Sequence, residues 1–189
     1  MRIITGSARG ANLLTLEGEE TRPTSARAKE AIFSILQFSI SGKRVLDLFA
    51  GSGQMGLEAL SRGADSAVFV DRSPKAVEII KKNAEKTRLA DKCRIECGDF
   101  SEKLARLNGE KFDIVFLDPP YALGAIPQAL SALLCGKNID ADSYVVCEAG
   151  SDEDFFWGDA ALEAAFDVVR RAKYGVAHVI ILQPKEKEL

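Results

Sequence analysis

The sequence predicts an α/β fold in which a mostly parallel sheet carries helices on both faces. From Val45 onward short apolar runs alternate with helical stretches, and these runs cover residues 45–49, 67–70, 93–96, 112–117 and 144–147. Repeated β-α units of this length imply parallel strands joined by right-handed crossovers. Two later strand-like runs, residues 168–171 and 176–182, are separated by only four residues. A gap that short permits a hairpin but no helical crossover, so we expect one antiparallel strand.

Local signals predict where several helices begin and end. Thr24 or Ser25 can cap a helix that runs to about Phe38, because the apolar residues between them recur at helical spacing. Ser73 is followed directly by a proline, which is typical of a helix start. Residues 124–134 read as another helix, stopped by the glycine at position 136.

The first residues are expected to form a small extension of the main fold. Residues 2–5 and 12–16 are strand-like pieces around a turn that contains two glycines, which predicts an N-terminal β-hairpin. A chain of 189 residues with 47% hydrophobic content suits one domain with a substantial core. We therefore expect a single domain over residues 1–189, with the hairpin extension in 1–20 and the Rossmann-like core in 21–189.

Composition argues against several classes of protein. The four cysteines form no C-x-x-C pair and there is one histidine, so no metal site is expected. The thiols read as small core hydrophobes kept reduced in the cytosol. No apolar run has the length of a signal peptide or a membrane span. We expect a soluble, cytoplasmic protein, and a monomer.

The apolar run at residues 112–117 ends in Asp118, Pro119, Pro120 and Tyr121. Each proline lacks an N–H and fixes φ, so the chain must leave the sheet there and hold Asp118 at the strand's end. A carboxylate and a free prolyl carbonyl can accept both hydrogens of one NH₂ group while Tyr121 stacks on a flat base. The motif therefore predicts a site for a planar amine. Taken alone, it is also compatible with a simple strand-terminating turn.

A glycine-rich segment follows the first predicted strand of the core. Gly51, Gly53 and Gly56 match G-x-G-x-x-G, and Asp71 comes 20 residues after Gly51 at the end of the next strand. The glycines let the backbone turn tightly and approach a ligand, and Asp71 can accept both hydroxyls of a ribose. This pattern is common to sites for NAD and for S-adenosylmethionine.

Acidic residues at the strand ends favour S-adenosylmethionine over NAD. Asp47 lies at the end of the first strand, where it would repel a pyrophosphate but accommodate a sulfonium and a zwitterionic methionine tail. Asp99 offers a carboxylate to the adenine amino group, and Phe100 offers a ring to its face. Asp118 then ends the fourth strand near the expected methyl group. The predicted cofactor-binding residues are Asp47, Phe49, Gly51, Ser52, Gly53, Asp71, Arg72, Asp99, Phe100 and Asp118.

Taken together, these motifs resemble the bacterial RsmD family. The resemblance rests on residues 1–6, 22–24, 29–30, 46–53, 56–59 and 118–121, and it runs from residue 1 to roughly 125. It implies a class I methyltransferase fold with a seven-stranded sheet, S-adenosylmethionine as cofactor, and methylation of the exocyclic N2 of a guanine in 16S rRNA. Its substrate would be the small ribosomal subunit or an assembly intermediate. The region after Ser151 carries no motif of the family.

In the implied reaction, particular residues take roles that follow from their chemistry and charge. Asp118, Pro119, Pro120 and Tyr121 would hold the target amine and its base. Residues 1–44 hold seven Lys and Arg against four Glu, so this end of the chain is the candidate for contact with a polyanion. The predicted RNA-binding residues are Arg2, Arg9, Arg22, Arg27 and Lys29, although Arg22 or Lys29 could equally hold the methionine carboxylate.

Three other functions stay open on the sequence alone. A methyltransferase acting on adenine N6 in DNA or RNA, or on a glutamine amide, would use a similar site, but such enzymes typically have Asn where this chain has Asp118. An NAD-dependent oxidoreductase is disfavoured because no motif places a His, Lys or Tyr to handle a substrate proton. A non-catalytic RNA-binding module is the third alternative.

Overall fold

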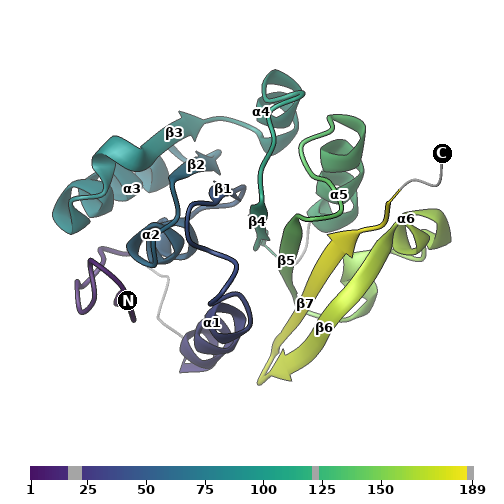
Figure 1. The fold of residues 1–189 in the computed structure, drawn as a ribbon, viewed down its shortest axis with the longest axis horizontal. Helices are drawn as coiled ribbons and strands as arrows, with labels where there is room; N and C mark the ends of the chain where they lie inside the picture. Colours follow the sequence, from purple (N-terminus) through teal and green to yellow (C-terminus); the bar gives the residue numbers. More distant parts are fainter. Residues whose placement is uncertain (17–22, 121–123, 187–189) are drawn as a thin grey trace.

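The structure is a computed structural model that describes residues 1–16, 23–120 and 124–186. Its centre is a seven-stranded sheet with the strand order β3-β2-β1-β4-β5-β7-β6 (Figure 1). The strands are β1 (Arg44–Asp47), β2 (Ser66–Asp71), β3 (Cys93–Cys97), β4 (Ile114–Leu117), β5 (Tyr144–Ala149), β6 (Phe166–Tyr174) and β7 (Ala177–Pro184). The chain reverses its direction of travel across the sheet between β1 and β4, which is where open α/β sheets bind ligands.

The pairing of the strands confirms the predicted sheet. β1 to β5 pair in parallel, and β7 runs antiparallel to both of its neighbours, β5 and β6. β7 is thus the one strand of opposite direction. Its connection to β6 is the short hairpin that the four-residue gap predicted.

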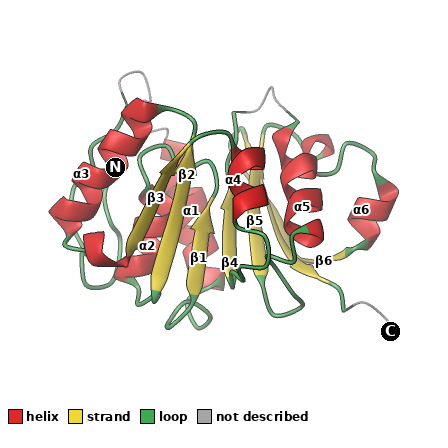
Figure 2. Ribbon diagram, turned by 90° about the horizontal axis from the view of Figure 1, so that it is seen from above, coloured by secondary structure: helices red, strands yellow, loops and turns green. Residues whose placement is uncertain are grey.

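Helices cover both faces of the sheet (Figures 1 and 2). One face carries α1 (Pro23–Ile35), α2 (Gln54–Ser61) and α3 (Pro74–Thr87). The other carries α4 (Phe100–Arg106), α5 (Ala125–Cys135) and α6 (Ala160–Ala164). Each face has its own cluster of buried apolar side chains, so the central strands β1, β2, β4 and β5 are largely buried on both sides, as their continuous apolar runs indicated.

Two predicted helix boundaries are confirmed and one is wrong. Ser73 caps α3, its hydroxyl accepting from the Ala76 amide, and Gly136 follows the end of α5. The helix predicted to reach Phe38 ends at Ile35 instead. Phe38 is 93% exposed, so it does not extend the buried stripe that stabilises the helix.

The predicted N-terminal hairpin forms only in part. Its two arms meet in a single antiparallel bridge between Arg2 and Asn12. The amides of Ile4 and Thr5 donate to the Glu58 carboxylate on α2, at 2.8 and 3.0 Å, rather than to a partner strand. These bonds tie the segment to the core and take the place of a longer ladder.

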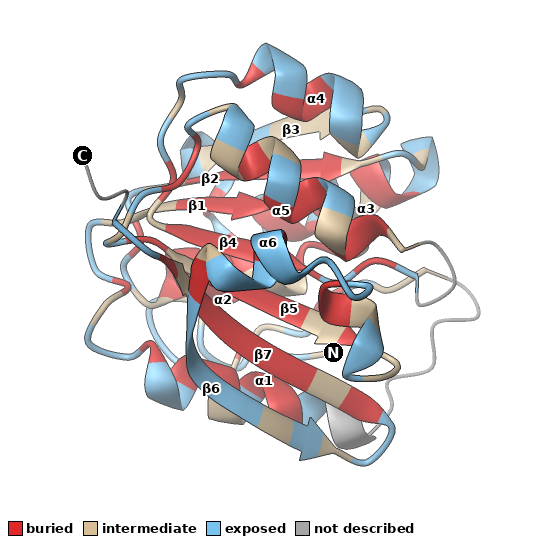
Figure 3. Ribbon diagram, turned by 90° about the vertical axis from the view of Figure 1, so that its right-hand side faces the viewer, coloured by how far each residue is buried: buried red, intermediate tan, exposed pale blue. Residues whose placement is uncertain are grey.

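The region after Ser151, which carries no family motif, packs onto the core through aromatic residues and β7. Phe155 and Phe156 are buried against the core, as expected of aromatics that hold a loop in place, whereas Trp157 is 62% exposed. Figure 3 shows β7 largely buried and β6 largely exposed, because β6 is the edge strand.

The cysteines agree with the sequence prediction only in part. Cys147 is buried and Cys93 is half-buried, but Cys97 and Cys135 are exposed, so reading all four as core residues was wrong. Within the described residues, no three His, Cys, Asp or Glu side chains gather as a metal site would require. No helix in the described part of the chain combines the length and apolarity needed to cross a membrane.

Candidate active site

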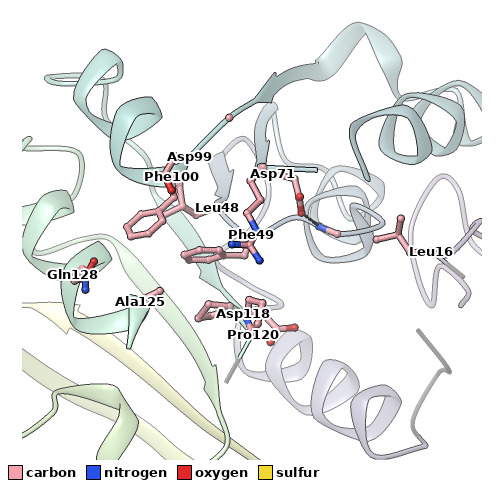
Figure 4. Close-up of a pocket in the computed structure, with 14 residues that line it drawn as sticks. Leu16, Leu48, Phe49, Asp71, Asp99, Phe100, Asp118, Pro120, Ala125 and Gln128 are labelled. Atoms are coloured by element: carbon pink, nitrogen blue, oxygen red, sulfur yellow. Dashed lines mark hydrogen bonds between the residues drawn. The ribbon is translucent and has the colours of Figure 1, made fainter. Parts of the chain in front are cut away.

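A cleft of about 620 Å³ opens where β1 to β4 end (Figure 4). This volume is in the usual range for a cofactor-sized ligand. Nine of the predicted site residues line it: Phe49, Gly51, Asp71, Arg72, Asp99, Phe100, Asp118, Pro119 and Pro120. The segments that follow four different strands therefore converge on one cavity, as parallel strands allow.

The glycine-rich loop has physical reasons for its glycines. Gly53 has φ of 77°, a left-handed conformation that side chains disfavour, and it directly precedes α2. A Cβ on Gly56 would lie 2.3 Å from the Phe69 ring, so this glycine permits close packing of α2 on β2. The loop is thereby held tightly against the sheet.

Asp71 lies at the end of β2 and holds the loop while facing the cleft. One carboxylate oxygen accepts from the Gly51 amide at 2.8 Å and the other from the Ser73 amide at 2.8 Å. Figure 4 shows the bond between Asp71 and the loop. Each oxygen of a carboxylate has two lone-pair sites, so Asp71 can still accept from ribose hydroxyls.

Asp47 is placed differently from the prediction. Its side chain is buried, accepts from the Gly56 amide at 3.0 Å, and is absent from the described lining of the cleft. Burial raises the pKa of Asp47 to about 7, and the nearby charge of Asp71 adds to the rise. Asp47 therefore anchors the start of α2 from below the loop. Ser52 and Gly53 are buried too and likewise do not line the described cleft.

Two aromatic rings and an acid form another part of the cleft wall, after β1 and β3. The rings of Phe49 and Phe100 lie 5.1 Å apart between centroids, tilted by 51° (Figure 4). Asp99 caps α4 by accepting from the Ser101 hydroxyl and amide, and the hydroxyl bond in particular lowers the pKa of Asp99. An ionised carboxylate beside two apolar ring faces suits a flat base that carries an amino group.

The amine motif lies where the sequence predicted it. Asp118 is exposed at the end of β4 and lines the cleft with Pro119 and Pro120. Tyr121 lies outside the described residues. Asp118 thus borders the cavity and is not buried in the protein interior.

The predicted RNA-binding residues separate into two groups. Arg2, Arg9 and Arg27 are exposed. Lys29 is 4% exposed and forms an ion pair of 3.0 Å with Glu58, which is fully buried, so the predicted phosphate contact of Lys29 is wrong. Burial lowers the pKa of the Lys29 ammonium, and the Glu58 carboxylate opposes this effect. Arg22 lies outside the described residues.

Several residues of the site were missed by the sequence analysis. Leu16, Leu48, Ala125 and Gln128 also line the cleft. Leu16 comes from the N-terminal segment and Gln128 from α5, and no motif marks either of them. Glu148, at the end of β5, lines a second hollow that it shares with Asp118, and the apolar run before it could have indicated its place.

Comparison with known proteins agrees with this geometry. A model of the family described as "Conserved hypothetical protein 95" matches residues 1–183. YlbH of Bacillus subtilis is 34% identical over 98% of this chain and 100% of its own length. "Ribosomal RNA small subunit methyltransferase D" of Haemophilus influenzae is 38% identical over 73% of this chain and 72% of its own length.

The chain belongs to the RsmD family. The solved structure of yhhF from Escherichia coli superposes with a TM-score of 0.84 and 27% identity, each chain being covered to 99%. The predicted class I methyltransferase fold is confirmed, and membership of a methyltransferase family supports S-adenosylmethionine as the cofactor.

The residues of the cleft fit this cofactor. Asp71 ends β2, from where an acidic residue can bind a ribose in open α/β folds, the Phe49 and Phe100 rings offer apolar faces to a flat base, and the cavity has the size of a cofactor site. Asp71, Asp99 and Asp118 all line it, and this excess of carboxylates suits a cation and opposes a pyrophosphate. The RsmD-family protein thus has a site built for a positively charged adenosine compound.

Proposed function

We propose that this RsmD-family protein methylates the exocyclic N2 of a guanine in 16S rRNA, in the small ribosomal subunit or an assembly intermediate. The name of the Haemophilus relative supports a ribosomal RNA substrate. The observation that carries the proposal is the position of Asp118, Pro119 and Pro120 at the end of β4, on the wall of the cofactor cleft. We further propose that the protein acts as a monomer in the cytoplasm, where small ribosomal subunits are assembled.

Orientation of the amine is the first task of the site. The N2 lone pair of guanine is delocalised into the ring, so the nitrogen is a poor nucleophile. Asp118 and the Pro119 carbonyl each accept one hydrogen of the NH₂ group, which directs the lone pair toward the cleft. S-adenosylmethionine supplies the electrophilic methyl group when it is bound there. Holding the amine in one geometry and placing a carboxylate beside its growing positive charge both lower the barrier.

The proton of the methylated amine must also leave. The Asp118 carboxylate already accepts one of the amine hydrogens, so it can take that proton or pass it to water. Aspartate carboxylates are in general modest bases. Asp118 therefore acts mainly by orientation and charge stabilisation.

Access to N2 requires an unpaired base, because the atom lies on the Watson–Crick edge. A base that is swung out of a helix needs a stacking partner, and Tyr121 follows the prolines directly in the sequence. Arg2, Arg9 and Arg27 are exposed and can contact phosphates without losing an ion pair in the described structure. Arg22 stays in the proposal from sequence alone.

Replacing Asp118 tests the proposed role directly. Asp118→Ala should abolish methyl transfer to small-subunit particles from cells that lack the enzyme, while affinity for S-adenosylhomocysteine stays within a few-fold. Calorimetric titration measures the affinity, and transfer of labelled methyl groups measures the activity. Asp65→Ala, which changes an exposed aspartate far from the cleft, is the matched control. Full turnover by the Asp118→Ala variant would exclude the acceptor model.

A further inference from the structure

A second, smaller hollow adjoins the cleft at Asp118, on the side of α1. Its volume is about 30 Å³, room for the edge of a base but not for a whole ring. Asp118 and Glu148 line it from the ends of β4 and β5, and Gln54 and Met55 line it from the start of α2. Nothing in the proposed handling of the amine uses Glu148.

The sheet places the two carboxylates side by side. β4 and β5 are neighbouring parallel strands with Leu117 opposite Cys147, so the next residues, Asp118 and Glu148, are neighbours at the strand ends. Phe116 and Val146 belong to the core on the α1 face. Because alternate residues of a strand share a face, Asp118 and Glu148 point to that same face. Adjacent strands lie about 4.8 Å apart, so carboxylates from two neighbouring strand ends are close enough to converge on one base edge.

Two adjacent carboxylates match one standard RNA base. Guanine presents the N2 amine and the N1–H next to each other, both as donors, and an ionised carboxylate accepts only. Adenine and cytosine carry an acceptor nitrogen beside their amine, and uracil has no amine. A carboxylate facing such an acceptor nitrogen has no hydrogen to accept and its charge is opposed by the lone pair.

We propose that this hollow is the subsite for the Watson–Crick edge of the target base, and that Glu148 selects guanine by accepting its N1–H. The inference rests on the proposed function and adds the residue that distinguishes guanine from other amines. An ionised carboxylate has about four lone-pair sites, so Glu148 can accept from the base in addition to contacts within the protein. Glu148 is half-buried, which strengthens a charge-assisted bond relative to one in open water.

The test compares two bases that both carry the 2-amino group. Semisynthetic 16S rRNA, reconstituted into particles, carries at the modified position either guanosine or 2-aminopurine riboside, which has an acceptor at N1. The wild-type protein should prefer guanosine in kcat/KM by about tenfold or more, the usual worth of a hydrogen bond to a charged group. In Glu148→Gln, whose amide can also donate, the preference should shrink about tenfold or more, mainly through a loss on guanosine.

Controls separate selectivity from folding and from cofactor binding. Glu148 does not line the described part of the larger cleft, so S-adenosylhomocysteine should raise the melting temperature of the Gln variant as much as that of the wild type. Glu163→Gln changes an exposed glutamate on α6 and should leave the preference unchanged. Glu148→Asp keeps an acceptor-only side chain and should keep the preference at a lower rate, which tests the idea even if the Gln variant folds poorly.

The outcomes are distinguishable. A preference for guanosine that stays within about twofold of the wild-type value in Glu148→Gln overturns the subsite while leaving the proposed function intact. An absent preference in the wild type, or an equal loss in the Asp and Gln variants, also overturns it. A wild-type product other than N2-methylguanosine would overturn both the subsite and the proposed function.

Discussion

Replacing Asp47 by Asn should make the protein more stable at neutral pH. Asp47 is 4% exposed and burial raises its pKa from 3.8 to about 7. Between about pH 4 and pH 7 the folded state keeps a proton that the unfolded state has lost, so the contribution of this group to stability falls as pH rises. At 1.36 kcal/mol per pKa unit, the loss reaches at most about 4 kcal/mol. An Asn oxygen can still accept from the Gly56 amide, which Asp47 binds at 3.0 Å.

The assay is urea unfolding of both proteins at several pH values from 4 to 8. The free energy of unfolding of Asp47→Asn should match the wild type near pH 4 and exceed it increasingly toward pH 7.5. Carboxylates whose pKa values are lowered, such as Asp113 beside Lys43, have the opposite pH dependence. These carboxylates are present in both proteins, so their contributions cancel in the difference between the two free energies of unfolding. A difference that is independent of pH would refute the assignment of Asp47 as a buried carboxyl beneath the loop.

Glu58→Gln should destabilise the protein by about 3–5 kcal/mol in urea unfolding, because it leaves the buried Lys29 ammonium without its charged partner; a loss below about 1 kcal/mol would contradict this. Arg9→Ala should reduce the magnitude of the slope of log binding constant against log salt concentration for RNA by about one. Lys81→Ala, which changes an exposed residue of α3, should leave this slope unchanged. Equal slopes would remove Arg9 from the RNA surface. Phe49→Leu should weaken S-adenosylhomocysteine binding about 2- to 10-fold in calorimetry, since one of the two ring faces is lost. Unchanged affinity would show that the adenosine does not contact this ring.

The sheet was predictable because its signals are local. Continuous apolar runs mark strands buried on both faces, and the short gap before β7 excludes a helical crossover, so both follow from the sequence. The N-terminal hairpin was only half predictable because the amides of Ile4 and Thr5 bind Glu58, which lies 53 or more positions away. The end of α1 depends on whether Phe38 finds a buried partner, and no local pattern decides that.

The residues of the site show the same contrast between local signals and contacts made by distant parts of the chain. Asp71, Asp99 and Asp118 were predictable because they lie at the ends of strands or within two residues after them, and the ends of parallel strands meet at one edge of the sheet. Lys29 was mispredicted because a lysine on a helix looks exposed until its buried partner is known. Asp47 shows a similar limit, since a position at a strand's end does not reveal whether the side chain faces the ligand or the core.

The most direct test of the proposed function is to identify the methylated nucleoside. Small-subunit particles from cells that lack the enzyme are incubated with the protein and labelled S-adenosylmethionine, and the RNA is digested to nucleosides. We expect the label in N2-methylguanosine from 16S rRNA. Label in N6-methyladenosine, in protein, or in no product would contradict the proposal.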